Sequence, residues 1–195
     1  MRLPRTFYER DTIEVARSLL GQHLVRCTED GKITTGRIVE TEAYCGRFDP
    51  ACHSYKGKTE RTRVMFGARG CAYIYLIYGM YNCLNFVTGA EGEPEAVLIR
   101  AIEPIDGLDL MAERRGTDKV RNLCSGPGKL TMAMDITRDL GGVDLVHSPH
   151  LYLTAGQAAS EIITSKRINI DYAGEAADYL WRFSEAGSRF ISVKP

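Results

Sequence analysis

The chain has no excess charge of either sign, because 25 lysines and arginines balance 25 aspartates and glutamates among its 195 residues. It also lacks an apolar run of the roughly 20 residues that a membrane helix needs, since Gly79, Asn82 and Asn85 interrupt the uncharged stretch 71–87. No internal repeat, low-complexity segment or linker is present. We therefore expect one domain over residues 1–195 and no membrane partner, and any contact with a polyanion must come from a local patch of charge.

The six cysteines show no C-x-x-C spacing, and the N-terminus MRLPRTFYERD lacks the apolar core of a signal peptide. These absences predict a reducing, cytosolic setting. Cys45, Cys52 and His53 could contribute to a metal site, but no fourth ligand follows at a recognised spacing. We therefore expect no metal.

Two common catalytic motifs are also absent. The segment SGPGKL lacks the spaced first glycine and the following serine or threonine of a phosphate-binding loop, and no G-x-S-x-G sequence occurs. This excludes hydrolysis of a nucleoside triphosphate. Lys129 remains a candidate contact for a DNA phosphate, because a helix is predicted to begin after Gly126-Pro127.

Local patterns predict helices mixed with strands and hairpins. Asp11, in a capping-box arrangement with Glu14, begins a helix over 11–20. Asp30-Gly31 favours a hairpin turn, and Gly79 marks a second bend. Further helices are predicted over 106–115 and after Pro127. Strands are predicted over 23–30, 33–44, 72–78, 81–87, 95–104, 150–154, 166–172 and 189–193.

Glu40 and Glu42 lie two residues apart in GRIVETEAY, which we expect to be a strand ending at Tyr44. Side chains alternate along a strand, so these three residues share one face. The two carboxylates are then roughly 6.5 Å apart, at the lower end of the separation used by inverting glycosidases. Two interpretations stay open: an acid-base pair that hydrolyses a glycosidic bond, or a charged strand edge that faces water.

Arg100 stands between Ile99 and Ala101 in the apolar segment AVLIRAIEP. Burial of an unpaired guanidinium is prohibitively costly, so a buried Arg100 needs an anionic partner or must line a cleft. The alternative is a strand that turns this side chain toward solvent. The sequence leaves the two equally open.

Tyr78, Met80 and Tyr81 surround Gly79 at the predicted bend. Large side chains at a hairpin tip project into solvent unless something receives them, and proteins that kink a duplex use such wedges. Ring stacking contributes about 1 to 3 kcal/mol per base, which offsets much of the few kcal/mol needed to extrude a nucleotide. Ordinary cross-strand packing is the alternative.

The segment 47–70 is polar and charged, which predicts a long surface loop. His53 in this loop could stack on a base or donate to it, although a lone histidine is more often a structural hydrogen-bonder. Within this loop, residues 56–69 contain five basic residues and only Glu60 as a counter-charge: Lys56, Lys58, Arg61, Arg63 and Arg69. They indicate either a solvated surface or a contact with a nucleic-acid backbone.

These motifs resemble the alkyladenine (3-methyladenine, methylpurine) DNA glycosylase family. They match in order over nearly the whole chain: GRIVETEAY, His53-Ser54, YIYLIYGMYNCLN, VLIRAIEP, LCSGPGKL and AGE near the C-terminus. The resemblance implies an α+β fold, a single mixed domain with a curved, mainly antiparallel sheet, flanking helices and a protruding hairpin. It also implies a monomer that acts without metal or cofactor on double-stranded DNA containing damaged purines.

The resemblance assigns catalytic roles by position. Glu42 corresponds to the general base, Arg100 helps to hold the attacking water, and the backbone carbonyl of Ile168 is a further water contact. Glu40 also aligns but corresponds to no comparable role, which weakens the two-carboxylate interpretation.

Contacts with the base and the duplex are assigned in the same way. The pocket that stacks on and hydrogen-bonds the flipped base comprises Tyr44, His53 and Tyr75. Asn85 corresponds to the residue that disfavours normal guanine by crowding its exocyclic amine. Tyr78 corresponds to the residue inserted into the duplex, with Met80 and Tyr81 beside it.

The predicted function is a monofunctional DNA glycosylase that flips damaged purines (3-methyladenine, 7-methylguanine, hypoxanthine, ethenoadenine) out of duplex DNA. It then hydrolyses the N-glycosidic bond in base excision repair and leaves an abasic site. Two alternatives remain: a non-catalytic DNA-damage-binding protein of the same fold, and a nucleoside or carbohydrate hydrolase that uses Glu40 with Glu42. The lack of the long N-terminal extension of some eukaryotic relatives favours a bacterial protein at the nucleoid; a eukaryotic one would act in the nucleus.

Overall fold

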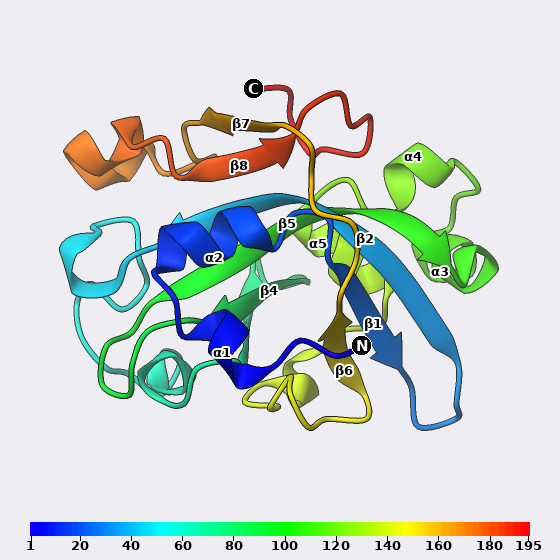
Figure 1. Ribbon diagram of the computed structural model, residues 1–195, viewed down its shortest axis with the longest axis horizontal. Helices are drawn as coiled ribbons and strands as arrows, with labels where there is room; N and C mark the ends of the chain where they lie inside the picture. The colour runs from blue at the N-terminus through cyan, green and yellow to red at the C-terminus, as the bar shows by residue number, and fades with distance from the viewer.

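The computed structural model covers the whole chain and is organised around one long strand, β2 (Ile33–Tyr44). The strand β5 (Ala96–Asp106) pairs with β2 along one side. On the other side, β1 (His23–Cys27) pairs with the first part of β2, and β8 (Arg182–Glu185) pairs with residues 40–42. With partners on both sides, the second half of β2 lies in the interior (Figure 1).

The sheet is antiparallel throughout, with the main order β3-β4-β5-β2-β1-β6, and β7 pairs with β8 beside this path. The remaining strands are β3 (Ala72–Ile77), β4 (Tyr81–Val87), β6 (Leu151–Thr154) and β7 (Ile162–Ser165). The predicted α+β class with a mainly antiparallel sheet is confirmed.

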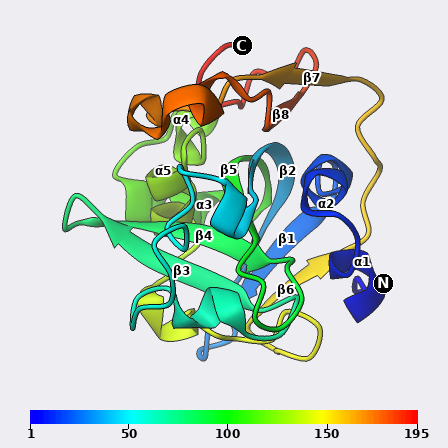
Figure 2. The ribbon, with the colours of Figure 1, turned by 90° about the vertical axis from the view of Figure 1, so that its left-hand side faces the viewer.

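Short helices cover both faces of the sheet. Figure 2 shows α1 and α2 on one side of the central strands and α3, α4 and α5 on the other. The helices are α1 (Arg5–Tyr8), α2 (Thr12–Ser18), α3 (Leu108–Arg115), α4 (Val120–Leu123) and α5 (Pro127–Ala133). Four 3-10 segments add η1 (Gly46–Phe48), η2 (Arg63–Phe66), η3 (Arg138–Leu140) and η4 (Asp171–Asp178). None of these helices has the length and apolarity required to span a membrane.

The predicted helix boundaries hold to within two residues. The Asp11 carboxylate accepts hydrogen bonds from the amides of Ile13 and Glu14, which satisfies donors that the first turn leaves free. α3 begins at Leu108 rather than at residue 106 because Asp106 still belongs to β5. α5 begins at Pro127 itself, whereas the sequence predicted a start after Gly126-Pro127.

The hairpin β3–β4 extends away from the body of the protein (Figure 2). Its two central turn residues, Tyr78 and Gly79, have φ values of 53° and 70°. Residues 78–80 form a three-residue loop between the paired Ile77 and Tyr81, and the Met80 N–H donates to the Ile77 carbonyl. Positive φ at Tyr78 and Gly79 suits such a tight turn, but it is uncommon for a residue with a bulky side chain. The turn thus accepts some backbone strain and places a tyrosine at its tip.

Two of the three late strands predicted from the sequence are wrong. Residues 150–154 contain β6 as expected, whereas 166–172 and 189–193 are not strands. The backbone amides that would join a sheet bond buried carboxylates instead: Ile168 donates to Glu42 and Ser192 donates to Glu40. The strands of this region are β7 and β8.

Candidate active site

Glu42 is fully buried near the end of β2, and three groups donate hydrogen bonds to it. The backbone N–H of Ile168 donates to Oε1 at 2.8 Å. The Tyr44 hydroxyl donates to Oε2 at 2.8 Å, and Arg100 Nη1 lies 3.3 Å from the same oxygen. Because the guanidinium and the amide can only donate, both carboxylate oxygens of Glu42 serve as acceptors.

Arg100 reaches this carboxylate because the sheet is irregular at that point. The β2–β5 register passes from Glu40↔Ala101 to Thr41↔Ile99 and leaves Arg100 without an opposite residue. Such a bulge redirects a side chain relative to the ordinary alternation of a strand. The solvent-facing alternative for Arg100 is therefore wrong: its side chain is 9% exposed and forms ion pairs with two glutamates.

Neighbouring carboxylates stabilise the positive charge of Arg100. Burial lowers its pKa, but attraction from Glu42 and Glu40 outweighs burial and leaves the pKa above its ordinary value. Burial raises the pKa of Tyr44 well above its ordinary value of 10.0, and the negative charge of Glu42 makes the second-largest contribution in the same direction. Tyr44 therefore stays protonated and remains a donor to Glu42.

Glu40 is also fully buried, so the interpretation of a charged strand edge facing water is wrong. Its Oε1 accepts from Arg182 Nε at 2.7 Å and lies 3.4 Å from Arg100 Nε. The backbone N–H of Ser192 donates to Oε2 at 2.5 Å. Glu40 thus anchors the C-terminal segment and β8, and its partners distinguish it from Glu42.

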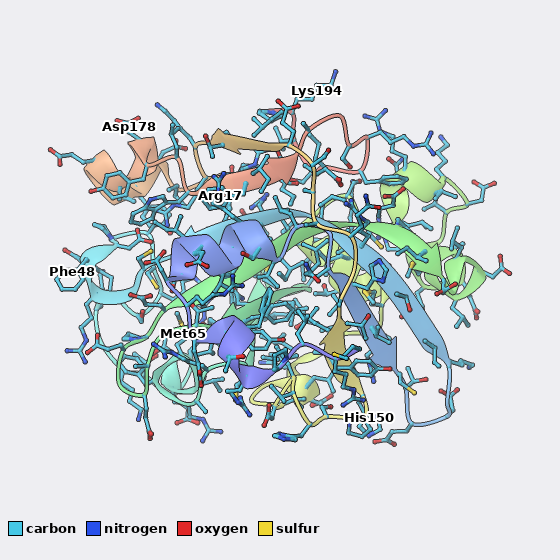
Figure 3. The ribbon with its side chains drawn as sticks, in the orientation of Figure 1. Arg17, Phe48, Met65, His150, Asp178 and Lys194 are labelled. Carbon is cyan, nitrogen blue, oxygen red and sulfur yellow. The ribbon has the colours of Figure 1, made fainter.

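Three of the four residues assigned to the base pocket line one cavity: Tyr44, His53 and Asn85. Its other walls are Ala51, Cys52, Met65, Tyr73 and Ala96. Met65, labelled in Figure 3, belongs to η2 and is 2% exposed. The cavity holds about 20 Å³, room for about one water molecule. A purine therefore requires the aromatic side chains to separate.

Tyr75, the fourth pocket residue, stands beside this cavity. Its ring packs edge-on against His53, with the ring centroids 4.4 Å apart and an interplanar angle of 79°. The Arg61 guanidinium lies 5.1 Å from the centroid of the Tyr75 ring. This arrangement joins the basic loop to the aromatic pocket.

His53 keeps contact with solvent, but its imidazole lies among the tyrosine rings. Its Nδ1 is 3.2 Å from the Tyr73 hydroxyl. Desolvation, with a further contribution from the Arg61 charge, lowers the pKa of His53 to about 4. At neutral pH the ring is therefore uncharged, with one N–H that can donate.

Asn85 is 3% exposed, and its amide is held by the backbone. Its Nδ2 donates to the carbonyls of Tyr73 at 3.1 Å and Cys83 at 3.3 Å. These bonds hold the amide against β3 and fix how far the side chain projects into the cavity.

The hairpin tip exposes the three large side chains assigned to the duplex. Tyr78 is 75% exposed, Met80 65% and Tyr81 39%. The packing alternative fails for Tyr78, whereas Tyr81 also contacts α5, where an added Cβ at Gly128 would lie 2.9 Å from the Tyr81 Cβ. The α5 helix therefore supports the hairpin at Tyr81, directly after the turn, while Tyr78 at the tip stays free.

Lys129, the predicted phosphate contact, lines a surface hollow of about 540 Å³ together with Lys119 and Arg121. The three cations come from α4, α5 and the residue before α4. Such a cluster suits a polyanionic backbone.

The basic loop is less uniform than the sequence implied. Arg63 pairs with Glu60 at 3.0 Å, but both side chains are well exposed, which makes this pair weak. Arg69 is half-buried and donates to the Thr88 carbonyl at 2.9 Å. Lys56 and Lys58 remain exposed.

Two buried charges beside the site were not predicted from the sequence. Asp49 and Arg167 form an ion pair at 2.5 Å with both side chains fully buried. They are far apart in the chain, and no local pattern marks either one. Only the position of Arg167 directly before Ile168 connects it to the motif residues.

Comparisons with known proteins identify a family and several relatives. A family model described as methylpurine-DNA glycosylase (MPG) matches residues 6–189. A protein of Methanocella arvoryzae is 54% identical, with the match covering 98% of this chain and 96% of the relative. Proteins of Methanoculleus marisnigri and Alkaliphilus oremlandii are 52% and 49% identical, with 98% or more of each chain covered. All three are named, provisionally, as 3-methyladenine DNA glycosylases.

Proposed function

The chain belongs to the methylpurine-DNA glycosylase family and is a hydrolase of N-glycosyl bonds that acts on DNA; we propose that it extrudes damaged purines from the duplex and uses Glu42 to activate water. The observation that carries this proposal is the buried Glu42 carboxylate, held by Arg100, Tyr44 and Ile168 beside an aromatic cavity. Its substrates extend from 3-methyladenine to 7-methylguanine, hypoxanthine and ethenoadenine.

Glu42 takes a proton from water, and the water oxygen attacks C1′ of the extruded nucleotide. The bond from C1′ to the purine nitrogen breaks through an oxocarbenium-like transition state, and its electron pair leaves with the base. The products are the free purine and an abasic site. Strand cleavage by a Schiff base is not expected, because none of the groups that contact Glu42 is a lysine.

The exposed tip of the hairpin supports extrusion. Tyr78 fills the space that the rotated purine leaves, with Met80 and Tyr81 beside it, and stacking of about 1 to 3 kcal/mol offsets the lost base stacking. The cations around Lys129 contact the sugar-phosphate backbone and supply binding that does not depend on sequence.

The leaving base determines how much assistance it needs. Cationic 3-methyladenine and 7-methylguanine leave readily, whereas neutral hypoxanthine and ethenoadenine need a hydrogen bond or a proton at the purine. Neutral His53 supplies a hydrogen bond from its N–H rather than a full proton. Tyr44 and Tyr75 stack against the base.

The decisive experiment measures single-turnover excision from a duplex with one hypoxanthine, with alkali to reveal abasic sites. We expect Glu42→Gln to slow excision by about 10²- to 10⁴-fold while binding to the lesion duplex is retained. Glu103→Gln, on the neighbouring strand β5, is the matched control and keeps the wild-type rate. Full excision by Glu42→Gln would refute the assigned base.

The same assay separates the rival functions. Tight binding to the lesion duplex without any base release identifies a damage-binding protein. Turnover of free nucleosides at the rate of duplex DNA identifies a nucleoside hydrolase.

We further propose that the protein acts as a monomer at the nucleoid. The relatives come from bacteria and archaea, whose DNA lies in the cytoplasm. Sedimentation of the protein with and without a lesion duplex tests the monomeric state.

A further inference from the structure

The buried ion pair between Asp49 and Arg167 plays no part in the mechanism described above. Arg167 Nη1 lies 2.5 Å from Asp49 Oδ2, and Nη2 lies 2.8 Å from Oδ1, so the contact is bidentate. Neither side chain is exposed to solvent. A bidentate arginine-carboxylate pair is geometrically specific, which suits it to hold segments in a fixed relation.

The pair joins segments from three parts of the chain. Arg167 Nη1 donates to the carbonyl of Ala43 in β2 at 3.0 Å, and Nη2 donates to the carbonyl of Ala176 in η4 at 3.2 Å. Asp49 accepts from the amides of Cys45 and Ala51, at the two ends of the loop that carries η1. The end of β2, the η1 loop and η4 therefore meet at one ion pair.

Figures 1 and 2 show the same meeting of segments. In both views η4 lies directly above the loop of η1, and Figure 3 labels Phe48 at the outer end of that loop and Asp178 in η4. Ala51 packs with Ala173 and Ala176 of η4 in one buried cluster. Ala51 also lines the base cavity.

Both oxygens of Glu42 depend on groups that Arg167 holds. Ile168, the next residue in the chain, donates its N–H to Oε1. Tyr44 donates to Oε2, and the Arg167 guanidinium lies 4.8 Å from the centroid of the Tyr44 ring. The same guanidinium also lies 5.0 Å from the centroid of the Trp181 ring.

A buried ion pair adds little net stability to a fold, because both charges must be desolvated. Removal of two charges from water costs several kcal/mol per ion, and apolar replacements of similar volume are often neutral or stabilising. Arg167 Nε in addition has no hydrogen-bond partner, although it is buried. This desolvation cost has an explanation if the pair holds neighbouring groups in a fixed geometry rather than stabilising the fold.

We propose that Asp49 and Arg167 are positioning residues that hold Tyr44 and Ile168 in the arrangement that orients Glu42 for attack. This inference rests on the proposed function of Glu42. Displacement of a catalytic group by about 1 Å from a change outside the chemistry can slow a reaction about 10²-fold. The pair therefore acts on the rate of the chemical step and leaves DNA binding to the hairpin and the basic surface.

The test compares Asp49→Asn and Arg167→Lys with a matched pair elsewhere in the sheet. Arg37 and Glu185 also form a bidentate, largely buried ion pair, which joins β2 to β8 without contacting Glu42. Arg37→Lys and Glu185→Gln are therefore the controls. Three quantities are measured for each variant: the single-turnover excision rate, the dissociation constant for the lesion duplex, and hydrogen exchange of the Ile168 amide.

We expect Asp49→Asn and Arg167→Lys to slow excision by about 10- to 100-fold, with the dissociation constant changed by less than about 2-fold. The Ile168 amide should exchange faster in both variants. The control variants should lose comparable thermal stability yet keep the wild-type excision rate and Ile168 exchange. Should Asp49→Asn fail to fold, Arg167→Lys retains the charge and decides the test.

Wild-type excision in a folded Arg167→Lys protein would overturn the proposal, and so would equal slowing by the Arg37 and Glu185 variants. Hydrogen exchange separates this outcome from failure of the proposed function. If wild-type protein releases no base but Ile168 exchange still responds only to the Asp49 and Arg167 changes, the positioning of Glu42 stands and the glycosylase mechanism does not.

Discussion

Arg100 Nη1 lies 3.3 Å from Glu42 Oε2, and its Nε lies 3.4 Å from an oxygen of Glu40, so one guanidinium serves two buried carboxylates. Arg182 provides Glu40 with a second cation, whereas Arg100 is the only cation within ion-pair distance of Glu42. The two glutamates therefore differ in their dependence on Arg100, although both lie on β2.

Replacement of Arg100 by methionine should impair both folding stability and excision. The change leaves Glu42 buried without a cation, which costs about 3 to 5 kcal/mol of the free energy of unfolding. Arg100→Lys keeps the charge but not the fork, so it should unfold nearer to wild type while excision still falls by at least about 10-fold. Urea unfolding and single-turnover excision measure the two effects. Arg182→Lys is the control, because Arg182 contacts Glu40 but not Glu42. A greater loss of excision in Arg182→Lys than in Arg100→Lys would contradict the role assigned to Arg100.

Removal of the Tyr78 ring should reduce excision from duplex DNA more than from single strands. Tyr78→Ala forfeits a stacking contribution of about 1 to 3 kcal/mol, which corresponds to about 5- to 150-fold in the population of the extruded state. The loss should shrink when the lesion lies in single-stranded DNA, where little stacking must be replaced. Tyr152→Ala, on β6 at the opposite end of the sheet order from the hairpin, serves as the control. Equal losses on both substrates would show that Tyr78 does not replace the base.

Shortening of Asn85 should relax discrimination against guanine. Asn85→Ser opens space where the exocyclic amine would lie, so release of normal guanine, measured against hypoxanthine in paired oligonucleotides, should rise. The carbonyls of Tyr73 and Cys83 lose their donor, and the free energy of unfolding should fall by about 1 to 3 kcal/mol. An unchanged ratio of guanine to hypoxanthine release in a folded variant would argue against a role in selectivity.

The His53 imidazole should titrate near pH 4 in the folded protein. Between the unfolded value of 6.5 and the folded value of about 4, the unfolded chain binds a proton that the folded chain does not. This group therefore destabilises the fold as the pH falls from 6.5 toward 4, and has no such effect above that window. NMR titration of the ring gives the pKa directly. The acid-induced loss of stability over this window should be smaller in His53→Gln, and a ring that titrates near 6.5 would remove the basis for a neutral donor.

Local sequence determined those parts of the fold that depend on near neighbours. The capping of α2 by Asp11 follows from residues within three positions of each other. Likewise, the hairpins at Gly31 and Gly79 need only turn residues that accept positive φ. The exposed Tyr78 could be predicted because a turn places its central side chains outside the sheet.

The late strands show where such reasoning stops. Residues 166–172 and 189–193 have the apolar alternation of strands, but Ile168 and Ser192 give their amides to buried carboxylates. The two glutamates lie more than a hundred residues earlier in the chain, and no local pattern reports that competition.

The sequence by itself therefore determined the family, the hairpin and the identity of the chemical groups, because motifs and turns are local. The tertiary structure alone decided that Glu42 is buried, that a bulge turns Arg100 toward it, and that Asp49 meets Arg167. Burial is a property of what packs against a residue: β2 becomes interior only when β5 and β8 pair along it. The free energy of a buried charge then depends on partners brought from distant parts of the chain.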